Sequence, residues 1–217
     1  MNEKTKPTAP PVWNAANLAS FSRILVTVFF LFFIFRPEVW AKWTAGFLFA
    51  WGAFSDYLDG YLARKHNLKS DFGALLDPLA DKVLLLSVFV AFVQMDLVPA
   101  WMVVVIAARE FLITGLRQVA QSYHVVIAAS RAGKHKTVSQ IVAASFILAI
   151  ICIRATAEKY PESWGWAAVQ PGADGGWVHR LVSAGPYWLM LYATAMSVVS
   201  GVDYFIKNRH ILSGRKS

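Results

Sequence analysis

Four aspartates with helical spacing are the residues of this sequence best suited to chemistry. Asp56 and Asp59 stand three positions apart, and further along the chain Asp77 and Asp81 stand four positions apart. Residues at these spacings share one face of an α-helix, so each pair would present two carboxylates together. Pro78 suits the first turn of the second helix, because its missing N–H is no loss there. A short connection between the helices would make them antiparallel neighbours and bring all four carboxylates together.

Such a carboxylate cluster predicts a site for divalent cations. Like charges held close together repel each other, and near lipid they are also costly. Oxygen-only ligands favour Mg²⁺, Mn²⁺ or Ca²⁺ over zinc, which prefers nitrogen and sulfur. Gly60 and Ala63 follow the first pair, and their small size would let a ligand lie against the helix backbone. Two metal ions beside such a groove suit phosphoryl transfer. The alternative is that each aspartate is a solvated charge near a helix end.

A group of cations later in the chain predicts a pocket for an anion. Arg109 and Arg117 are eight residues apart, close to two helical turns, so they should point roughly alike. Lys134 and Lys136 add two more cations. Such a pocket fits an acceptor that carries a phosphate, although the same cations could be basic charges at a cytoplasmic membrane edge. Glu110 directly follows Arg109. A salt bridge between helix neighbours is poorly placed, so each of the two should need another partner.

The segments that must position these residues are six apolar runs. They span roughly residues 18–35, 43–55, 79–93, 98–108, 138–153 and 187–202. A membrane span needs about 20 mostly apolar residues, so these shorter runs predict helices with charged ends that extend into water. The first run could also belong to a signal peptide, but no small-residue cleavage site follows, which favours a retained helix. The connection from Arg154 to Pro186 is expected to be an outward-facing interfacial loop.

Composition favours an all-α integral membrane protein with six transmembrane helices. Of the 217 residues, 57% are hydrophobic and 16% are charged, whereas soluble domains carry about 45–50% and about 25%. Most of the 21 Lys and Arg residues fall on the side that holds both termini, which the positive-inside rule places in the cytoplasm. No dense basic run predicts nucleic-acid binding. The one cysteine, Cys152, excludes an internal disulfide and is expected to serve packing.

The expected organisation is one catalytic domain between two tails. We expect a flexible tail over residues 1–12, the six-helix transmembrane domain over residues 13–207 and a basic tail over residues 208–217. The short chain and the lack of a targeting extension favour a bacterial inner membrane, with the site facing the cytoplasm. Outside the enzymes, a small divalent-cation transporter is the alternative, because intramembrane carboxylates fit one too. A transport path, however, should place its ionisable groups near the midplane rather than at one edge.

The aspartates also belong to a longer pattern. The signature of the CDP-alcohol phosphotransferase family is D-x2-D-G-x2-A-R-x8-G-x3-D-x3-D, and this sequence resembles the family at all eight fixed positions. These are Asp56, Asp59, Gly60, Ala63, Arg64, Gly73, Asp77 and Asp81. The resemblance covers roughly Asn17 to the C-terminus. It implies six transmembrane helices, a homodimer, and a cytoplasmic site for two divalent ions, Mg²⁺ or Mn²⁺.

The resemblance implies a role for each matched residue. The metal ligands would be Asp56, Asp59, Asp77 and Asp81. Asp81 would also be the catalytic base that takes the proton of the acceptor hydroxyl. The CDP moiety would be bordered by Asn17, Asp56, Gly60, Ala63, Arg64 and Gly73.

Two motifs outside the signature resemble the phosphatidylglycerophosphate synthase branch of that family. They are R-E-x3-T-G-L-R over residues 109–117 and G-K-x-K-T-x2-Q over residues 133–140. The branch implies CDP-diacylglycerol as donor, glycerol 3-phosphate as acceptor and CMP as leaving group. The residues that would bind glycerol 3-phosphate are Arg109, Thr114, Arg117, Lys134 and Lys136. Serine, inositol phosphate and phosphatidylglycerol remain alternative acceptors.

Overall fold

The computed structural model describes most of the chain. Its described residues are 15–62, 71–122, 131–160 and 176–208. Within these ranges only the backbone is described for residues 15–20, 56–62, 71–81, 121–122, 131–132 and 177–179. The expected N-terminal tail, the expected C-terminal tail beyond Asn208, and the signature residues Ala63 and Arg64 lie outside the described residues.

Six α-helices make up the described part of the chain, as the six apolar runs predict. They are α1 (Ala15–Ile34), α2 (Val39–Leu62), α3 (Asp71–Gln94), α4 (Ala100–Ser122), α5 (Arg131–Lys159) and α6 (Trp177–Lys207). No strand occurs in the described ranges. Each helix is longer than its apolar run, because polar turns extend it at one or both ends.

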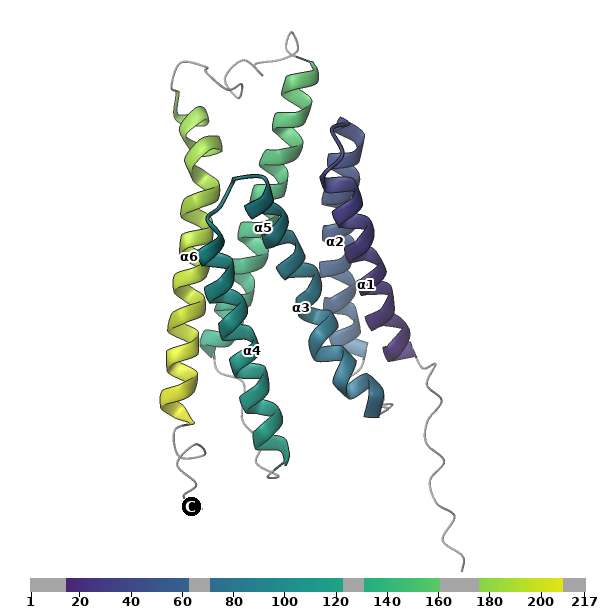
Figure 1. Ribbon diagram of the computed structural model, residues 1–217, viewed down its shortest axis with the longest axis vertical. Coiled ribbons are helices and arrows are strands. Elements are labelled where there is room, and N and C mark those ends of the chain that lie inside the picture. The colour runs from purple at the N-terminus through teal and green to yellow at the C-terminus, as the bar shows by residue number, and fades with distance from the viewer. Residues whose placement is uncertain (1–14, 63–70, 123–130, 161–175, 209–217) are drawn as a thin grey trace, which may run out of the picture.

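The six helices alternate in direction, so the start of α1 and the end of α6 lie at the same end of the bundle (Figure 1). The end of α2 and the start of α3 lie there too, and we call this the signature end. Helix α1 packs against α2 and α3. Helix α5 packs against α6 and α2, while α4 packs against α6 and α3. The bundle therefore brings the end of α4 and the start of α5 to the signature end as well.

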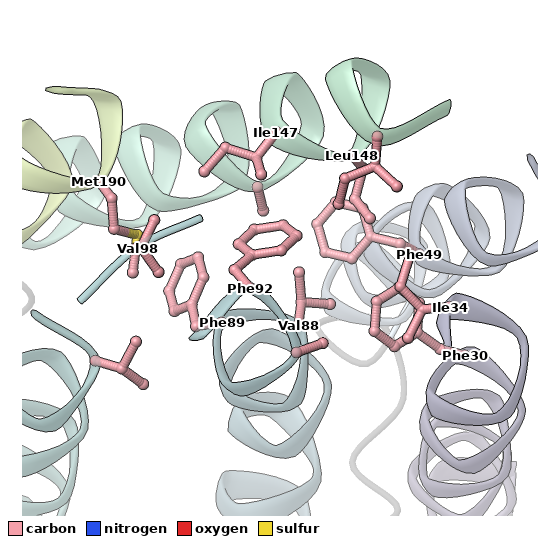
Figure 2. Close-up of a cluster of buried hydrophobic side chains, with 14 of the residues drawn as sticks. Phe30, Ile34, Phe49, Val88, Phe89, Phe92, Val98, Ile147, Leu148 and Met190 are labelled. Atoms are coloured by element: carbon pink, nitrogen blue, oxygen red, sulfur yellow. The ribbon is translucent and has the colours of Figure 1, made fainter. Parts of the chain in front are cut away.

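Among the described side chains, a hydrophobic core drawn from all six helices lies mainly in the half away from the signature end. In Figure 2, Phe92 of α3 lies between Ile147 of α5 and Val88, and Phe89 of α3 lies beside it, below Val98. The ring centroids of Phe89 and Phe92 are 6.3 Å apart. Met190 of α6 completes this group. Burying one such large apolar side chain away from water contributes about 1.5–3 kcal/mol, and close packing holds the helices in fixed register.

The turn from α3 to α4 is closed by a hydrogen-bonded C-cap. The Asp96 N–H donates to the Val93 carbonyl and the Leu97 N–H donates to the Phe92 carbonyl, both at 3.0 Å. This pair of bonds is a Schellman motif. Asp96 has a φ of 54°, a left-handed conformation that Asp tolerates better than most residues other than glycine. Leu97 packs on the core cluster that includes Phe92, which anchors the turn.

Gly52 allows α2 to approach α1 and α3 closely. A Cβ at this position would stand 2.5 Å from Leu84 Cδ2 and 3.5 Å from Val26 Cγ1. Gly52 lies one helical turn before Asp56. The absence of a side chain at Gly52 therefore sets how near the signature part of α2 comes to α3.

The predicted place of Pro78 is wrong. Helix α3 begins at Asp71, so Pro78 lies inside the helix rather than in its first turn. The turn before Pro78 includes the apolar residues Leu75 and Leu76, and the helix continues through it. A proline inside a helix removes one backbone hydrogen bond.

The predicted loop from Arg154 to Pro186 is also wrong at both of its ends. Helix α5 continues to Lys159 and α6 already begins at Trp177, while residues 161–175 lie outside the described residues. Pro186 has no N–H to donate to the carbonyl four residues earlier, which belongs to Val182. That carbonyl instead accepts a hydrogen bond of 2.9 Å from Arg154 Nη2 of α5. A side chain of the neighbouring helix thus replaces the missing bond, and α6 continues through the proline.

Large apolar side chains are exposed on the outside of the bundle. Examples from the six helices in order are Phe29, Phe47, Val90, Val104, Val142 and Trp188. By length and composition, two stretches of the described chain are able to cross a membrane: Gly133–Lys159 and Arg180–Lys207. Phe21–Ile34 and Lys82–Gln94 are shorter apolar helices.

Candidate functional site

The backbone places both aspartate pairs at the signature end. Asp56 and Asp59 lie in the last turns of α2, while Asp77 and Asp81 lie in the first half of α3. Asp56 stands six residues before the end of α2 at Leu62, and Asp77 stands six residues after the start of α3. Each is therefore about 9 Å along its helix from this end of the bundle, and α2 contacts α3. Four carboxylates on two adjoining helices are a donor set that fits divalent cations.

The side chains of all the signature residues lie outside the described residues, so their predicted roles remain predictions. The same holds for Asn17 in α1. Among the side chains that are described, no three His, Cys, Asp or Glu residues gather as a metal site would require. Cys152, which is described, is buried as expected.

Glu110 joins two of the predicted cations in a buried cluster. Arg109 Nη1 donates a hydrogen bond of 3.2 Å to Glu110 Oε1. Lys136 Nζ of α5 donates to the same oxygen atom. The exposed fraction of these side chains is 12% for Arg109 and Glu110 and 7% for Lys136. Two cations and one carboxylate are thus held together with little solvent, which leaves one net positive charge between α4 and α5.

Arg109 also reaches a third helix. Its Nη2 donates a hydrogen bond of 2.8 Å to Ser200 Oγ of α6, and Ser200 is buried. The expectation that Arg109 and Glu110 each need a partner other than one another is confirmed, since those partners are Ser200 and Lys136. The expectation that the two neighbours are poorly placed for a salt bridge is wrong. The long guanidinium side chain can reach its neighbour and Ser200 at once, because its separate N–H groups point in different directions.

The other residues predicted to bind the acceptor differ in their exposure to solvent. Lys134 and Arg117 are exposed, whereas Lys136 is buried because residues two apart on a helix face different sides. The Thr114 hydroxyl donates to the backbone carbonyl of Glu110 at 2.8 Å. The structure therefore divides the four predicted cations into a largely buried pair, Arg109 and Lys136, and an exposed pair, Arg117 and Lys134.

A polar strip on α6, of which only Ser200 is seen to contact the cluster, is a feature that sequence reasoning missed. Thr194, Ser197, Ser200 and Tyr204 are all buried. Their spacing of three or four residues is that of one helix face, and this spacing is the signal that could have indicated a polar face in an apolar helix. Ser197 Oγ, Tyr204 Oη and Gln140 Nε2 of α5 have no hydrogen-bond partner among the described residues.

Comparison with known proteins identifies the family. Residues 13–170 match the family described as CDP-alcohol phosphatidyltransferase, which is more than half of the chain. The chain belongs to this family. The resemblance carried by the eight signature positions is thereby confirmed. Membership of the CDP-alcohol phosphatidyltransferase family also makes this protein an enzyme of the phosphatidyltransferase class and disfavours the transporter alternative.

Curated members of the CDP-alcohol phosphatidyltransferase family from several bacteria are similar to the chain, and those below are named CDP-diacylglycerol–glycerol-3-phosphate 3-phosphatidyltransferase. The protein from Bacillus subtilis (strain 168) is 40% identical over 149 residues, covering 63% of this chain and 77% of the relative. The protein from Cereibacter sphaeroides is 29% identical over 222 residues, covering 94% and 99%. The protein from Rickettsia felis is 34% identical over 135 residues, covering 62% and 75%.

Proposed function

We propose that this protein transfers the phosphatidyl group of CDP-diacylglycerol to glycerol 3-phosphate, giving phosphatidylglycerophosphate and CMP. The similar bacterial proteins carry names that state this reaction. The observation in the structure that carries the proposal is the buried cluster of Arg109, Glu110 and Lys136. It lies in helices that reach the signature end, where the family's aspartates stand (Figure 1).

The cluster suits a phosphate better than an uncharged acceptor. Charge–charge attraction is stronger where solvent is largely excluded, and the cluster retains one net positive charge. A guanidinium offers a planar set of N–H donors that matches phosphate oxygens. We assign the phosphate of glycerol 3-phosphate to Arg109 and Lys136, with Thr114, Arg117 and Lys134 completing the acceptor site. Serine has less need of these cations, because its one carboxylate is balanced by its own ammonium group.

The donor, CDP-diacylglycerol, would bind at the signature residues. Asp56, Asp59, Asp77 and Asp81 would hold two Mg²⁺ or Mn²⁺ ions, which supply positive charge to the oxygens of the diphosphate. The residues proposed to border the CDP moiety are Asn17, Asp56, Gly60, Ala63, Arg64 and Gly73. The diacylglycerol part would extend from the bundle into the lipid.

The transfer itself needs one proton acceptor and a well-placed nucleophile. The Asp81 carboxylate takes the proton of the primary hydroxyl of glycerol 3-phosphate. The hydroxyl oxygen then forms a bond with the phosphorus that carries diacylglycerol. The bond between that phosphorus and the oxygen bridging to CMP breaks, and CMP leaves with the electron pair. The remaining contribution of the chain is to hold the hydroxyl in line through its phosphate, so most of the catalysis comes from positioning and charge stabilisation.

We further propose that the bundle lies in a bacterial inner membrane with its signature end in the cytoplasm. The apolar residues exposed on the outside of the bundle support this placement, as do the two stretches long enough to cross a bilayer. A soluble protein rarely exposes so many large apolar side chains. Assembly as a homodimer remains a prediction from the family.

The experiment that tests the function is CMP release by the purified protein in detergent with CDP-diacylglycerol and Mg²⁺. Glycerol 3-phosphate, serine, inositol phosphate and phosphatidylglycerol are supplied one at a time. We expect release with glycerol 3-phosphate alone, and loss of release when the metal is chelated. Asp81→Asn should remove turnover while nucleotide binding persists. Release with a different acceptor would overturn the assigned acceptor, and no release from folded protein with any acceptor would overturn the function.

A further inference from the structure

Arg109 is held between two helices by contacts on both sides of its guanidinium. Nη1 donates to Glu110 and Nη2 donates to Ser200 of α6. Nε is buried and has no hydrogen-bond partner among the described residues. The group is therefore oriented by two contacts and still has a free N–H donor, which is the state expected of an arginine prepared for an anion.

Gly201, next to Ser200, makes room for this side chain. A Cβ at Gly201 would stand 3.1 Å from Arg109 Cγ and 3.8 Å from Arg109 Nε. The first distance is tighter than an ordinary carbon–carbon contact of about 3.5–4.0 Å. Without a side chain at 201, the stem of Arg109 lies against the backbone of α6 and its head reaches Ser200. Both residues thus affect the same arginine: Ser200 accepts a hydrogen bond from its head, and Gly201 leaves room for its stem.

We propose that Ser200 and Gly201 are positioning residues that hold Arg109 in the orientation needed to bind the phosphate of the acceptor. This inference rests on the proposed function, in which Arg109 binds that phosphate. Arginine is long and flexible, so an arginine fixed before binding loses less conformational freedom when the ligand arrives. In this scheme neither residue has a role in binding the CDP-lipid. Substitution of either residue should therefore weaken binding of the acceptor and leave binding of the CDP-lipid unchanged.

The test compares Ser200→Ala and Gly201→Ala with the unaltered enzyme in detergent. For each we would measure kcat, KM for glycerol 3-phosphate, KM for CDP-diacylglycerol, the melting temperature, and inorganic phosphate binding by calorimetry. We expect KM for glycerol 3-phosphate to rise about fivefold in each variant, which is a partial loss because Arg109 keeps its contact with Glu110. Phosphate binding should weaken by a similar factor. KM for CDP-diacylglycerol should stay within about twofold.

Two matched controls come from α6 itself. Ser197→Ala removes a buried hydroxyl from the same polar strip, but Ser197 Oγ makes no hydrogen bond within the described chain. Gly185→Ala adds a Cβ whose nearest contact, Phe146 Cε1, is an ordinary 3.6 Å away. Both variants should keep the unaltered KM for glycerol 3-phosphate.

A double-variant cycle separates positioning from a structural role. Arg109→Met keeps an unbranched stem and removes the guanidinium. If Ser200 acts through Arg109, Ser200→Ala should have no further effect on KM for glycerol 3-phosphate or on phosphate binding in the Arg109→Met background. An undiminished effect in that background would overturn the inference, as would equal rises in both KM values.

The inference and the proposed function can fail separately. Absence of transfer by the unaltered protein would overturn the function, but phosphate binding and its dependence on Ser200 would still decide the inference. Transfer to glycerol 3-phosphate that is insensitive to both substitutions would overturn the inference alone. Absence of phosphate binding by the unaltered protein would also overturn it.

Discussion

Glu110 is the residue that turns two isolated cations into one site. Buried cations repel each other and are costly to desolvate, yet Arg109 and Lys136 meet on one oxygen of this carboxylate. The carboxylate therefore stabilises the pair when no anion is bound. A phosphate that enters the cluster finds the cations already gathered, and its own negative charge offsets the remaining positive one.

Glu110→Gln should lower stability, and phosphate should restore part of it. Removing one partner of a buried ion pair costs about 3 kcal/mol, which corresponds to a fall of roughly 6–12 °C in the melting temperature at this chain length. Inorganic phosphate should raise the melting temperature of Glu110→Gln more than that of the unaltered protein. Glu158→Gln, the same change at an exposed position of α5, is the control. Equal stabilisation of all three proteins by phosphate would contradict this account.

At the scale of the element, α6 shows how a helix persists through a proline. Pro186 is fully buried, and the carbonyl of Val182 that it cannot satisfy is bonded by Arg154. A buried carbonyl without a partner costs about 1–3 kcal/mol. The bond therefore both preserves the first turns of α6 and ties them to the last turns of α5.

Arg154→Leu should destabilise the protein by about 2 kcal/mol, lowering the melting temperature by roughly 4–8 °C. Pro186→Ala restores a backbone N–H four residues after Val182. Adding it to Arg154→Leu should therefore recover much of the lost stability. Arg180→Leu, at an exposed arginine of α6, serves as the comparison for loss of a cation. A double variant no more stable than Arg154→Leu alone would rule out this role of the hydrogen bond.

At the scale of the whole molecule, the distribution of polar and apolar residues between interior and exterior is partly the reverse of that in a soluble protein. Polar side chains such as Thr194 and Ser200 are buried and hydrogen-bonded inside the bundle, while Phe47 and Trp188 are about two-thirds exposed. Such an exterior is stable in lipid. Because lipid offers no hydrogen-bond partners, the polar groups inside must bond to one another. The expected orientation follows from the excess of Lys and Arg on the side of the signature end.

Cysteine labelling in intact bacterial cells tests this placement. Cys152 is buried and would be replaced by alanine. A single cysteine is then introduced by Lys159→Cys or by Lys207→Cys, at exposed positions that close opposite ends of the bundle. A membrane-impermeant maleimide should label the Lys159→Cys protein from outside and the Lys207→Cys protein only after lysis. The reverse pattern would invert the proposed orientation, and recovery of the protein in the soluble fraction would contradict membrane insertion.

Features that depend on residues close together in the chain could be read from the sequence. The six helices follow from six apolar runs, and each aspartate pair falls within a single helix because helical spacing is a local property. The eight signature positions identified the family for the same reason, since they occupy one short continuous stretch. The helix ends were less predictable, because Pro78 and Pro186 are ordinary helix-breaking signals and yet both lie inside helices. At Pro186 a hydrogen bond from Arg154 replaces the missing one.

Tertiary structure alone decided which distant residues meet. Arg109 and Ser200 are 91 positions apart and Glu110 and Lys136 are 26 apart, and no local pattern links them. Their contacts exist because α4 packs against α6 and both α4 and α5 reach the signature end. The same packing decided that Lys136 is buried while Lys134, two residues earlier, is exposed. Sequence determines which face of a helix a residue occupies, whereas the packing of helices determines what that face contacts.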